Sequence, residues 1–359
     1  MNLETCRPLC LHRDEHLSMA CRMKPVPLPG TATVSELHRV RAMCGNVYAA
    51  RSTPPASDIL IPTWIDIDYW ELSGTVEPGL TSIIIPVRGA HAALLRCLTA
   101  LAANTQGEYE VVIVIDDEEY KENIFHEAFD GPAFASLRDR IGMCRTKEPL
   151  GFPAACNAGV FASRGEFIVL LNSDAYVTTG WLPPLLGAIA NTPVGAAGPV
   201  GPNVFGVQGN QQSPAREIVA AAAREGWAGV ADVLTVTTAS WLRWHESKPS
   251  EAFQTKRLVG YCLAIRRSLW NMVGGLYEGY GLGNFDDDDL CLRLRLLERT
   301  LLVVPESLVL HEGSQSFGAL WGEQAEQQYD KLLGENRVKF GARWAWVNDY
   351  YQRRMEAKR

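Results

Sequence analysis

Residues 81–117 read TSIIIPVRGAHAALLRCLTALAANTQGEYEVVIVIDD, and the rest of the chain extends the pattern that begins here. Residues 81–87 form a β-branched run closed by Pro86, which predicts a buried strand. Leucines recur at helical spacing over residues 90–104, which predicts a helix. Residues 110–115 predict a second buried strand, and two aspartates follow it. The order strand, helix, strand is typical of a parallel α/β unit.

The same alternation continues beyond this stretch. Residues 153–163 predict a helix of small residues, and the strongly apolar residues 167–171 predict a third strand. Further strands are expected at 258–265, 300–305 and 308–311, and further helices at 267–273 and from near Asp287. The fold class is therefore α/β, a Rossmann-type sandwich around a mainly parallel central sheet. Such sheets bind their ligands beyond the carboxyl ends of the strands.

Flanking regions and an insertion interrupt this pattern. Residues 1–60 contain Pro-rich breaker clusters and predict an irregular N-terminal extension. Residues 201–257 are rich in Gly, Ala, Gln and Trp and predict an inserted or linking segment. Residues 319–359 are polar with helical tendency and predict a C-terminal helical tail. Two halves of the main body remain, residues 78–200 and residues 258–318.

The composition is that of an ordinary globular protein, with 47% hydrophobic and 21% charged residues in a chain of 359. The net charge of −7 disfavours a nucleic-acid partner, because such binding relies on positive surface charge. No apolar run approaches the roughly 18–20 residues that cross a bilayer, and charges interrupt the N-terminus where a signal peptide needs an apolar core. The nine cysteines are an odd number and fit reduced thiols. These features predict a cytoplasmic protein without a transmembrane segment.

The N-terminal extension carries zinc-type side chains without a standard paired spacing. One set is Cys6, Cys10, His12, His16 and Cys21, and an alternative set is Cys21, His38 and Cys44. Two other interpretations of residues 1–60 stay open. They form a disordered leader, or translation begins at Met19 or Met23.

Two polar groups follow predicted strands. Asn172, Ser173 and Asp174 come directly after residues 167–171. A carboxylate at a strand end suits a hard cation such as Mg(II) or Mn(II), although these residue types also favour turns. His311 follows the apolar residues 308–310, which gives it a similar position at a strand end.

Four consecutive aspartates, Asp286 to Asp289, precede leucines at helical spacing. One interpretation is a helix N-terminus, which acidic side chains stabilise by about 0.3–1 kcal/mol each. A cap needs only one or two acids, however, and four adjacent like charges repel unless a cation or substrate lies near. The run is therefore also a candidate catalytic site.

Several short sequence blocks, taken in their order along about residues 80–318, resemble those of family 2 glycosyltransferases of the GT-A fold. The blocks are TSIIIPVR (81–88), VVIVIDD (111–117), GFPAACNAG (151–159), RGEF (164–167), LLNSD (170–174), GGLYE (274–278), GNFDDDDLCLR (283–293) and HEGS (311–314). The resemblance implies that residues 78–200 bind a nucleotide sugar and that residues 258–318 carry the acceptor and catalytic half.

The resemblance also implies a nucleotide-diphosphate sugar as donor, with a UDP-sugar favoured, and Mn(II) or Mg(II) as cofactor. The residues it places at the donor are Pro86, Arg88, Asp116 and Asn157 in the nucleotide pocket, and Asn172 and Asp174 facing ribose and diphosphate. Asp174 and His311 would hold the metal. In this chain Asn172 stands where the family has the first acid of its DxD motif, and Arg88-Gly89 replaces a common aromatic-Asn pair.

An inverting transfer is the implied reaction, with Asp287 as general base and Asp286 beside it. Asp286 stands where the family usually has Glu, so the choice of base between the two stays open. The acceptor is expected to be a glycan or another hydroxyl-bearing molecule. Two other functions remain: an inactive nucleotide-sugar-binding scaffold, and a nucleotidyltransferase on a similar sheet. The sequence lacks the GxxxxGK[ST] loop of P-loop enzymes.

Overall fold

The computed structural model describes most of the chain from residue 76 to residue 347. The described residues are 59–60, 76–117, 134–146, 149–190, 193–202, 204, 206–209, 215–227, 229–247, 251–313 and 315–347. The predicted zinc-type sets and the alternative starts in residues 1–60 lie outside this part, as does the end of the predicted tail.

Ten strands form one sheet in the order β1-β4-β3-β2-β5-β9-β7-β10-β6, with β8 paired to β10. The strands are β1 (Ile59–Leu60), β2 (Glu77–Val87), β3 (Tyr109–Ile115), β4 (Ile141–Thr146), β5 (Gly165–Leu171), β6 (Ala175–Val177), β7 (Val194–Val200), β8 (Phe253–Thr255), β9 (Cys262–Arg266) and β10 (Thr300–His311). Parallel pairs join β4, β3, β2 and β5, and another joins β7 to β10. The short β9 pairs antiparallel with both β5 and β7, so these six strands share one direction.

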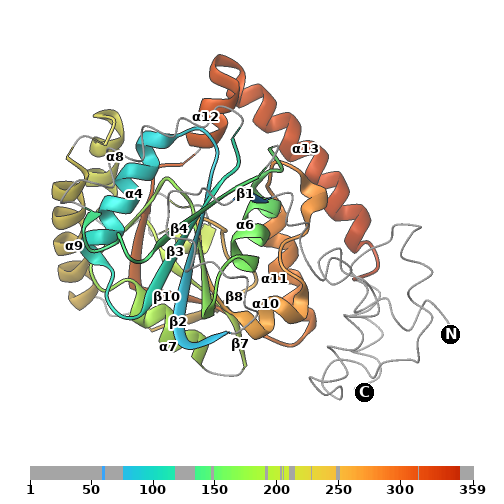
Figure 1. Cartoon of the computed structure of the whole chain (residues 1–359), viewed down its shortest axis with the longest axis horizontal. Helices are drawn as coiled ribbons and strands as arrows, with labels where there is room; N and C mark the ends of the chain where they lie inside the picture. The colour runs from blue at the N-terminus through green and yellow to red at the C-terminus, as the bar shows by residue number, and fades with distance from the viewer. Residues whose placement is uncertain are drawn as a thin grey trace.

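Helices cover both faces of this sheet. They are α4 (His91–Asn104), α6 (Phe152–Phe161), α7 (Leu182–Ala190), α8 (Ala215–Arg224), α9 (Val230–Ser247), α10 (Arg267–Val273), α11 (Asp286–Leu296), α12 (Gln315–Trp321) and α13 (Ala325–Trp344), with short 3₁₀ turns η3 (Gly206–Gln208), η4 (Glu278–Tyr280) and η5 (Gly322–Gln324). Figure 1 shows α4, α8 and α9 on one side of the strands and α6, α10, α11 and α13 on the other. The expected α/β sandwich with a mainly parallel sheet and a C-terminal helix is confirmed.

The core lies between these layers and explains why the predicted strands are so apolar. Every residue of β3 is buried, and so is β2 from Leu80 onward, because helices cover both faces. Gly159 of α6 allows the helix to lie directly on the sheet, since a Cβ there would stand 2.5 Å from Ile84 Cγ2. None of the described helices is both long and apolar enough to cross a membrane.

Some elements differ from the sequence expectations. Residues 201–257 contain the two helices α8 and α9, where an irregular segment is expected. The two strand candidates at 300–305 and 308–311 are one continuous strand, β10, because its partner β7 continues across the gap with a register shift. The division into an extension, two halves, an insertion and a tail stays a prediction.

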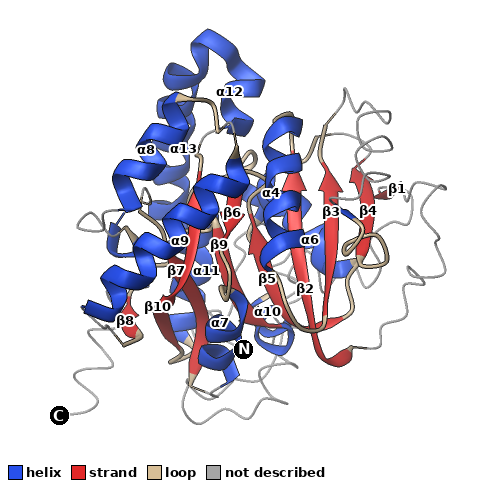
Figure 2. Cartoon of the chain, turned by 90° about the vertical axis from the view of Figure 1, so that its left-hand side faces the viewer, coloured by secondary structure: helices blue, strands red, loops and turns tan. Residues whose placement is uncertain are grey.

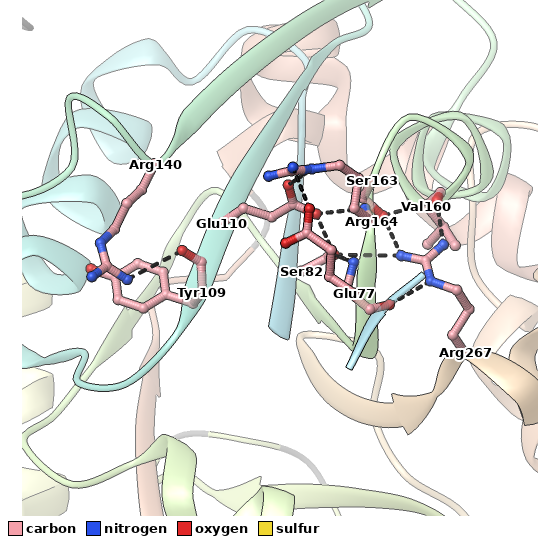
Figure 3. A network of polar contacts seen from close by, with 10 residues as sticks. Glu77, Ser82, Tyr109, Glu110, Arg140, Val160, Ser163, Arg164 and Arg267 are labelled. Carbon is pink, nitrogen blue, oxygen red and sulfur yellow. Dashed lines mark hydrogen bonds and ion pairs between the residues drawn. The ribbon is translucent and has the colours of Figure 1, made fainter. Parts of the chain in front are cut away.

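A network of buried charges ties the strands together at their N-terminal ends (Figure 3). Glu110 is 1% exposed and accepts hydrogen bonds from Ser82 Oγ at 2.6 Å and from the Arg164 backbone N–H at 2.6 Å. The buried Arg267 donates to the Val160 carbonyl and to Ser163 Oγ. Burial lowers the pKa of Arg267 to about 10, since the charged form is penalised. This network lies at the opposite end of the parallel strands from Asp116 and Asp174, which come after β3 and β5.

Two partners of Arg164 give a matched test of this network. Glu110→Gln removes a buried carboxylate and is expected to lower the free energy of unfolding by about 3 kcal/mol, because buried donors lose their charged partner. Glu77→Gln removes the partner that is 47% exposed and should cost less than about 1 kcal/mol. Urea denaturation followed by circular dichroism measures the free energy of unfolding of both variants. Equal losses would contradict the conclusion that the buried Glu110 contributes more than the exposed Glu77.

Candidate functional site

A cavity of about 790 Å³ lies at the C-terminal ends of the parallel strands. Eight of the nine side chains predicted from the sequence line it: Pro86, Arg88, Asp116, Asn172, Asp174, Asp286, Asp287 and His311. They come from the ends of β2, β3, β5 and β10 and from the start of α11. Residues more than 200 positions apart in the sequence therefore meet in one cavity. Figure 2 shows the strands side by side, with α12 beyond their C-terminal ends.

Asp116 is held in place by the start of α6. Its Oδ1 accepts from the Leu150 backbone N–H at 2.6 Å and from Thr146 Oγ1 at 2.9 Å, and its Oδ2 accepts from the Gly151 N–H at 2.8 Å. A helix N-terminus favours a negative charge at this position. Arg88 Nη1 lies 3.9 Å from Asp116 Oδ2 and makes no hydrogen bond within the described part of the chain. Arg88 therefore brings a positive charge to the cavity wall beside Asp116.

Asp174 and His311 face each other across the join between β6 and β10. His311 Nε2 lies 3.2 Å from Asp174 Oδ1 and 3.3 Å from Asn172 Nδ2, and the imidazole stacks on Tyr261 at 5.1 Å between ring centroids. The antiparallel pairing of His311 with Ala175 fixes this meeting, because it aligns the end of β10 with the residue after Asp174. The two predicted metal ligands are thus adjacent.

The chemistry of these donors fits a divalent cation. Carboxylate oxygen and imidazole nitrogen both bind Mn(II), and Mg(II) is commonly held by one or two carboxylates together with substrate phosphates. The Oδ1 atom of Asn172 is buried and has no hydrogen-bond partner among the described residues, so an amide oxygen is also available beside the pair. No group of three His, Cys, Asp or Glu side chains that could hold a metal occurs in the described part of the chain.

The four aspartates of α11 point in different directions and lie in different environments. Asp286 is 4% exposed, and its pKa is raised well above the ordinary range by burial and by the neighbouring charge of Asp287. Asp287 is half-buried and lines the cavity, where its Oδ2 accepts from the Gly260 N–H at 3.0 Å and its Oδ1 from the Asp288 N–H at 2.8 Å. These backbone donors orient the Asp287 carboxylate.

The other two aspartates of the run have ionic partners. Asp288 pairs with Arg257 Nε at 2.8 Å, and burial together with the charge of Asp287 raises the pKa of Asp288 to about 6. Asp289 is fully buried and does not line the cavity. It accepts from Arg293 Nε at 2.6 Å, Arg343 Nε at 2.8 Å and Trp344 Nε1 at 2.8 Å. Although burial alone would raise the pKa of Asp289, these cationic and N–H partners lower it. Asp289 is thus an internal anchor for α11 and α13.

Asn157 is the one predicted site residue that the structure places outside the cavity lining. Its Nδ2 donates to the Leu276 carbonyl at 2.8 Å, and its Oδ1 accepts from the Leu276 N–H at 2.8 Å. Both ends of the amide therefore bind the backbone of the same residue, Leu276, and join α6 to the segment that leads into the acidic run. Nearby Glu278 has its pKa raised to about 7 by burial.

Several cavity residues escape prediction from the sequence. Glu312 accepts from Arg96 Nη2 at 2.8 Å and from the Tyr176 hydroxyl, which fixes a further carboxylate beside His311. The apolar part of the wall includes four side chains from the C-terminal helices, Phe317, Leu320, Tyr329 and Leu333. Their helical spacing gives no sign of a binding role, because core packing produces the same pattern. These four side chains belong to the site because the C-terminal helices, far along the chain, lie at the same cavity as the strand ends.

A family model described as "Glycosyl transferase family 2" matches residues 82–271, which is more than half of the 359-residue chain. The chain therefore belongs to glycosyl transferase family 2, and the resemblance expected from the sequence blocks is confirmed. The acidic run and His311 lie beyond the C-terminal limit of the matched residues. Their part in the site rests on the geometry of the cavity.

Individual relatives are distant. The chain is 29% identical over 252 residues to an uncharacterized protein of Sinorhizobium fredii, y4gI, over 69% of this chain and 26% of that protein. It is 27% identical over 231 residues to the pre-mycofactocin glycosyltransferase of Mycobacterium tuberculosis, over 64% of this chain and 42% of that protein. A crystal structure of GalNAc-T7 with UDP, GalNAc and Mn2+ aligns with a TM-score of 0.46 at 16% identity, over 65% of this chain and 43% of that chain. The chain spans less than half the length of these relatives.

The same substitution at two positions of the acidic run should change stability in opposite directions. Asp286→Asn removes a carboxylate with a raised pKa, so the variant should be more stable than the wild type at pH 8, with the gain shrinking toward pH 4 as Asp286 becomes protonated. Asp289→Asn removes a carboxylate with a lowered pKa and should lose about 3 kcal/mol at pH 8, with the loss shrinking as the pH falls through that lowered pKa.

Urea denaturation at a series of pH values measures the two variants against the wild type. The ordinary pKa of an aspartate is about 3.9, so the Asp286 effect grows above that value. Shifts of the same sign for both variants at pH 8 would contradict the distinct environments described for the two carboxyl groups.

Proposed function

We propose that this protein is a metal-dependent inverting glycosyltransferase, which moves a sugar from a nucleotide-diphosphate donor to an acceptor hydroxyl. The observation that carries the proposal is that Asp174, His311 and Asp287 line one cavity. Arg88 and Asp116, which follow β2 and β3, line the same cavity. The cavity is large enough for a nucleotide sugar, since small-molecule sites typically measure about 300–1,000 Å³.

The donor would occupy the part of the cavity formed by the ends of β2, β3 and β5. Arg88 would contribute positive charge there, and Asp174 with His311 would hold Mn(II) or Mg(II) against the diphosphate. When bound, such a cation stabilises the negative charge that develops on the leaving phosphates. A UDP-sugar is the proposed donor. Among the residues predicted at the donor, Asn157 would act indirectly, by holding the segment after Leu276.

Asp287 is the proposed general base. The acceptor hydroxyl must lose a proton as it attacks, and a half-buried carboxylate oriented by two backbone donors can receive it. Asp286 is less suited, because it is buried, and burial together with the charge of Asp287 raises its pKa and so favours its neutral form. A single displacement needs one base and no covalent intermediate, and it inverts the configuration at the anomeric carbon.

The acceptor would approach past Phe317, Leu320 and Tyr329, which lie on the side of the cavity formed by α12 and α13. Aromatic side chains provide flat faces on which a sugar ring can stack. A glycan or another hydroxyl-bearing molecule is the acceptor class that this wall would accommodate.

Asp287→Asn tests the role of the base. The amide keeps the shape of the side chain and cannot accept the proton, so kcat should fall by about 10²–10⁴-fold while UDP binding changes little. The assay follows transfer or hydrolysis of UDP-sugars with Mn(II) and identifies the nucleotide that is released. Isothermal titration calorimetry measures UDP binding in parallel.

Asp288→Asn is the matched control, because Asp288 is the adjacent carboxylate and pairs with the exposed Arg257. Its activity should stay within a few fold of the wild type. Wild-type turnover by Asp287→Asn would contradict the role assigned to this residue. Release of pyrophosphate by the wild-type protein would identify a nucleotidyltransferase, and UDP binding without any turnover would identify an inactive scaffold.

A further inference from the structure

We propose that Asn336 of α13 is a positioning residue, which holds the loop before the acidic run so that Asp287 reaches the acceptor. The inference rests on the proposed function for its catalytic meaning. It concerns residues outside the range that the family model matches. The observations that carry it are the contacts of α13 on both sides of the Asp286–Asp287 pair.

Asn336 is completely buried, with 0% of its surface exposed. Its Nδ2 donates to the Tyr280 carbonyl at 2.8 Å and to the Gly283 carbonyl at 2.7 Å, with the Asn284 carbonyl at 3.4 Å. Three carbonyl groups around one amide nitrogen define the orientation of the side chain, because an oxygen there would be repelled. The Oδ1 atom has no hydrogen-bond partner among the described residues, so the side chain holds the loop through the Nδ2 hydrogen bonds.

The loop that Asn336 holds has a strained backbone. Asn284 and Phe285 are consecutive non-glycine residues in the left-handed region, with φ values of 70° and 69°, immediately before Asp286. Such conformations persist only where surrounding contacts impose them. Helix α13 supplies further contacts here, because the Tyr329 hydroxyl donates to Asn284 Oδ1 at 3.2 Å and Phe340 packs on Phe285 at 5.5 Å between ring centroids.

The same helix also holds the run from its other side. Arg343 and Trp344 both donate to Asp289 Oδ2 at 2.8 Å, near the C-terminal end of α13. Asp286 and Asp287 therefore lie between two attachments to one helix, Asn336 before them and Asp289 after them. Because α13 also contributes Tyr329 and Leu333 to the cavity wall, a single rigid element places the wall and the carboxylates together.

A fixed carboxylate matters for the proposed reaction, since a misplacement of about 1 Å can cost about 10²-fold in rate. Loss of the Asn336 donors would release the strained loop and let Asp287 leave its bond to the Gly260 N–H. Asp174 and His311, the proposed metal ligands, lie between β5 and β6 and at the end of β10, and would keep their places. The rate of the chemical step should therefore fall, whereas donor binding should not.

Asn336→Asp and Asn336→Ala test this role in the full-length protein. The first is isosteric and replaces the donor by oxygen, and the second removes the side chain. We expect kcat with a UDP-sugar and Mn(II) to fall by about 10–100-fold with the Kd for UDP within about threefold of the wild type. Hydrogen–deuterium exchange should become faster in residues 280–289 and stay unchanged in β2, β3 and β5.

Lys339→Ala is the matched control. Lys339 also donates from α13 to a carbonyl of this segment, that of Gly279, but it is exposed and does not line the cavity. Its kcat and exchange should match the wild type. If both Asn336 variants fail to fold, Tyr329→Phe keeps the ring and removes only the donor to Asn284, and it should show a selective fall in kcat of about 3–10-fold.

Three results would overturn the inference. One is an unchanged kcat in the Asn336 variants, or in Tyr329→Phe where those do not fold. Another is a fall in kcat that a matching loss of UDP binding explains, which would indicate general damage to the cavity. The third is unchanged exchange in residues 280–289 of a folded Asn336 variant. The exchange measurement needs no turnover, so it tests the attachment of the loop even if the wild-type protein proves inactive as a transferase.

Discussion

Repulsion between like charges is the constraint on which this site depends. Six carboxyl groups line a single cavity, and each needs a compensating group: Asp116, Asp174, Asp286, Asp287, Asp288 and Glu312. The six carboxyl groups are stabilised in four different ways. Backbone N–H groups hold Asp116 and Asp287, Arg257 and Arg96 pair with Asp288 and Glu312, and His311 faces Asp174. Burial raises the pKa of Asp286, which favours its neutral form.

Under the proposed function, this cavity would hold a cation and a phosphate-bearing ligand. Arg88, Asp174 and His311 are among the residues that line it, at the ends of β2, β5 and β10. The fold brings them together because parallel strands present their carboxyl ends at one edge, and because β6 and β10 align Asp174 with His311. The acidic run joins them through a different device, a strained loop fixed by α13. The four consecutive aspartates thus differ in position, since Asp287 lines the cavity and Asp289 anchors α11 to α13.

Much of this could be predicted from the sequence. The strands at 81–87, 110–115 and 167–171 follow from uninterrupted apolar runs, because a strand covered on both faces has no polar alternation. The candidate acids follow from their positions at strand ends. Asn157 illustrates the limit of such reasoning, since its type and neighbours resemble a ligand-binding block, yet its amide binds the backbone N–H and carbonyl of Leu276.

The features that the sequence did not reveal depend on distant partners. Helices α8 and α9 are rich in Ala and Thr, and their local sequence pattern does not predict a helix. Packing of α9 on α4 stabilises the helical conformation. The role of Asp289 depends on Arg343 and Trp344, more than fifty residues later, and nothing in the run distinguishes it from Asp287. The same holds for Asn336, because a lone asparagine in a polar helix gives no sign that it is buried.

The central claim is that carboxylate and imidazole from separate strands bind a divalent cation together with a nucleoside diphosphate. Isothermal titration of UDP into the wild-type protein and into Asp174→Ala, each with and without MnCl2, tests it most directly. Binding to the wild type should require or be strengthened at least about tenfold by Mn(II), a difference of about 1.4 kcal/mol, and the variant should lose that dependence. Equally tight, Mn(II)-stimulated binding by Asp174→Ala would contradict the account.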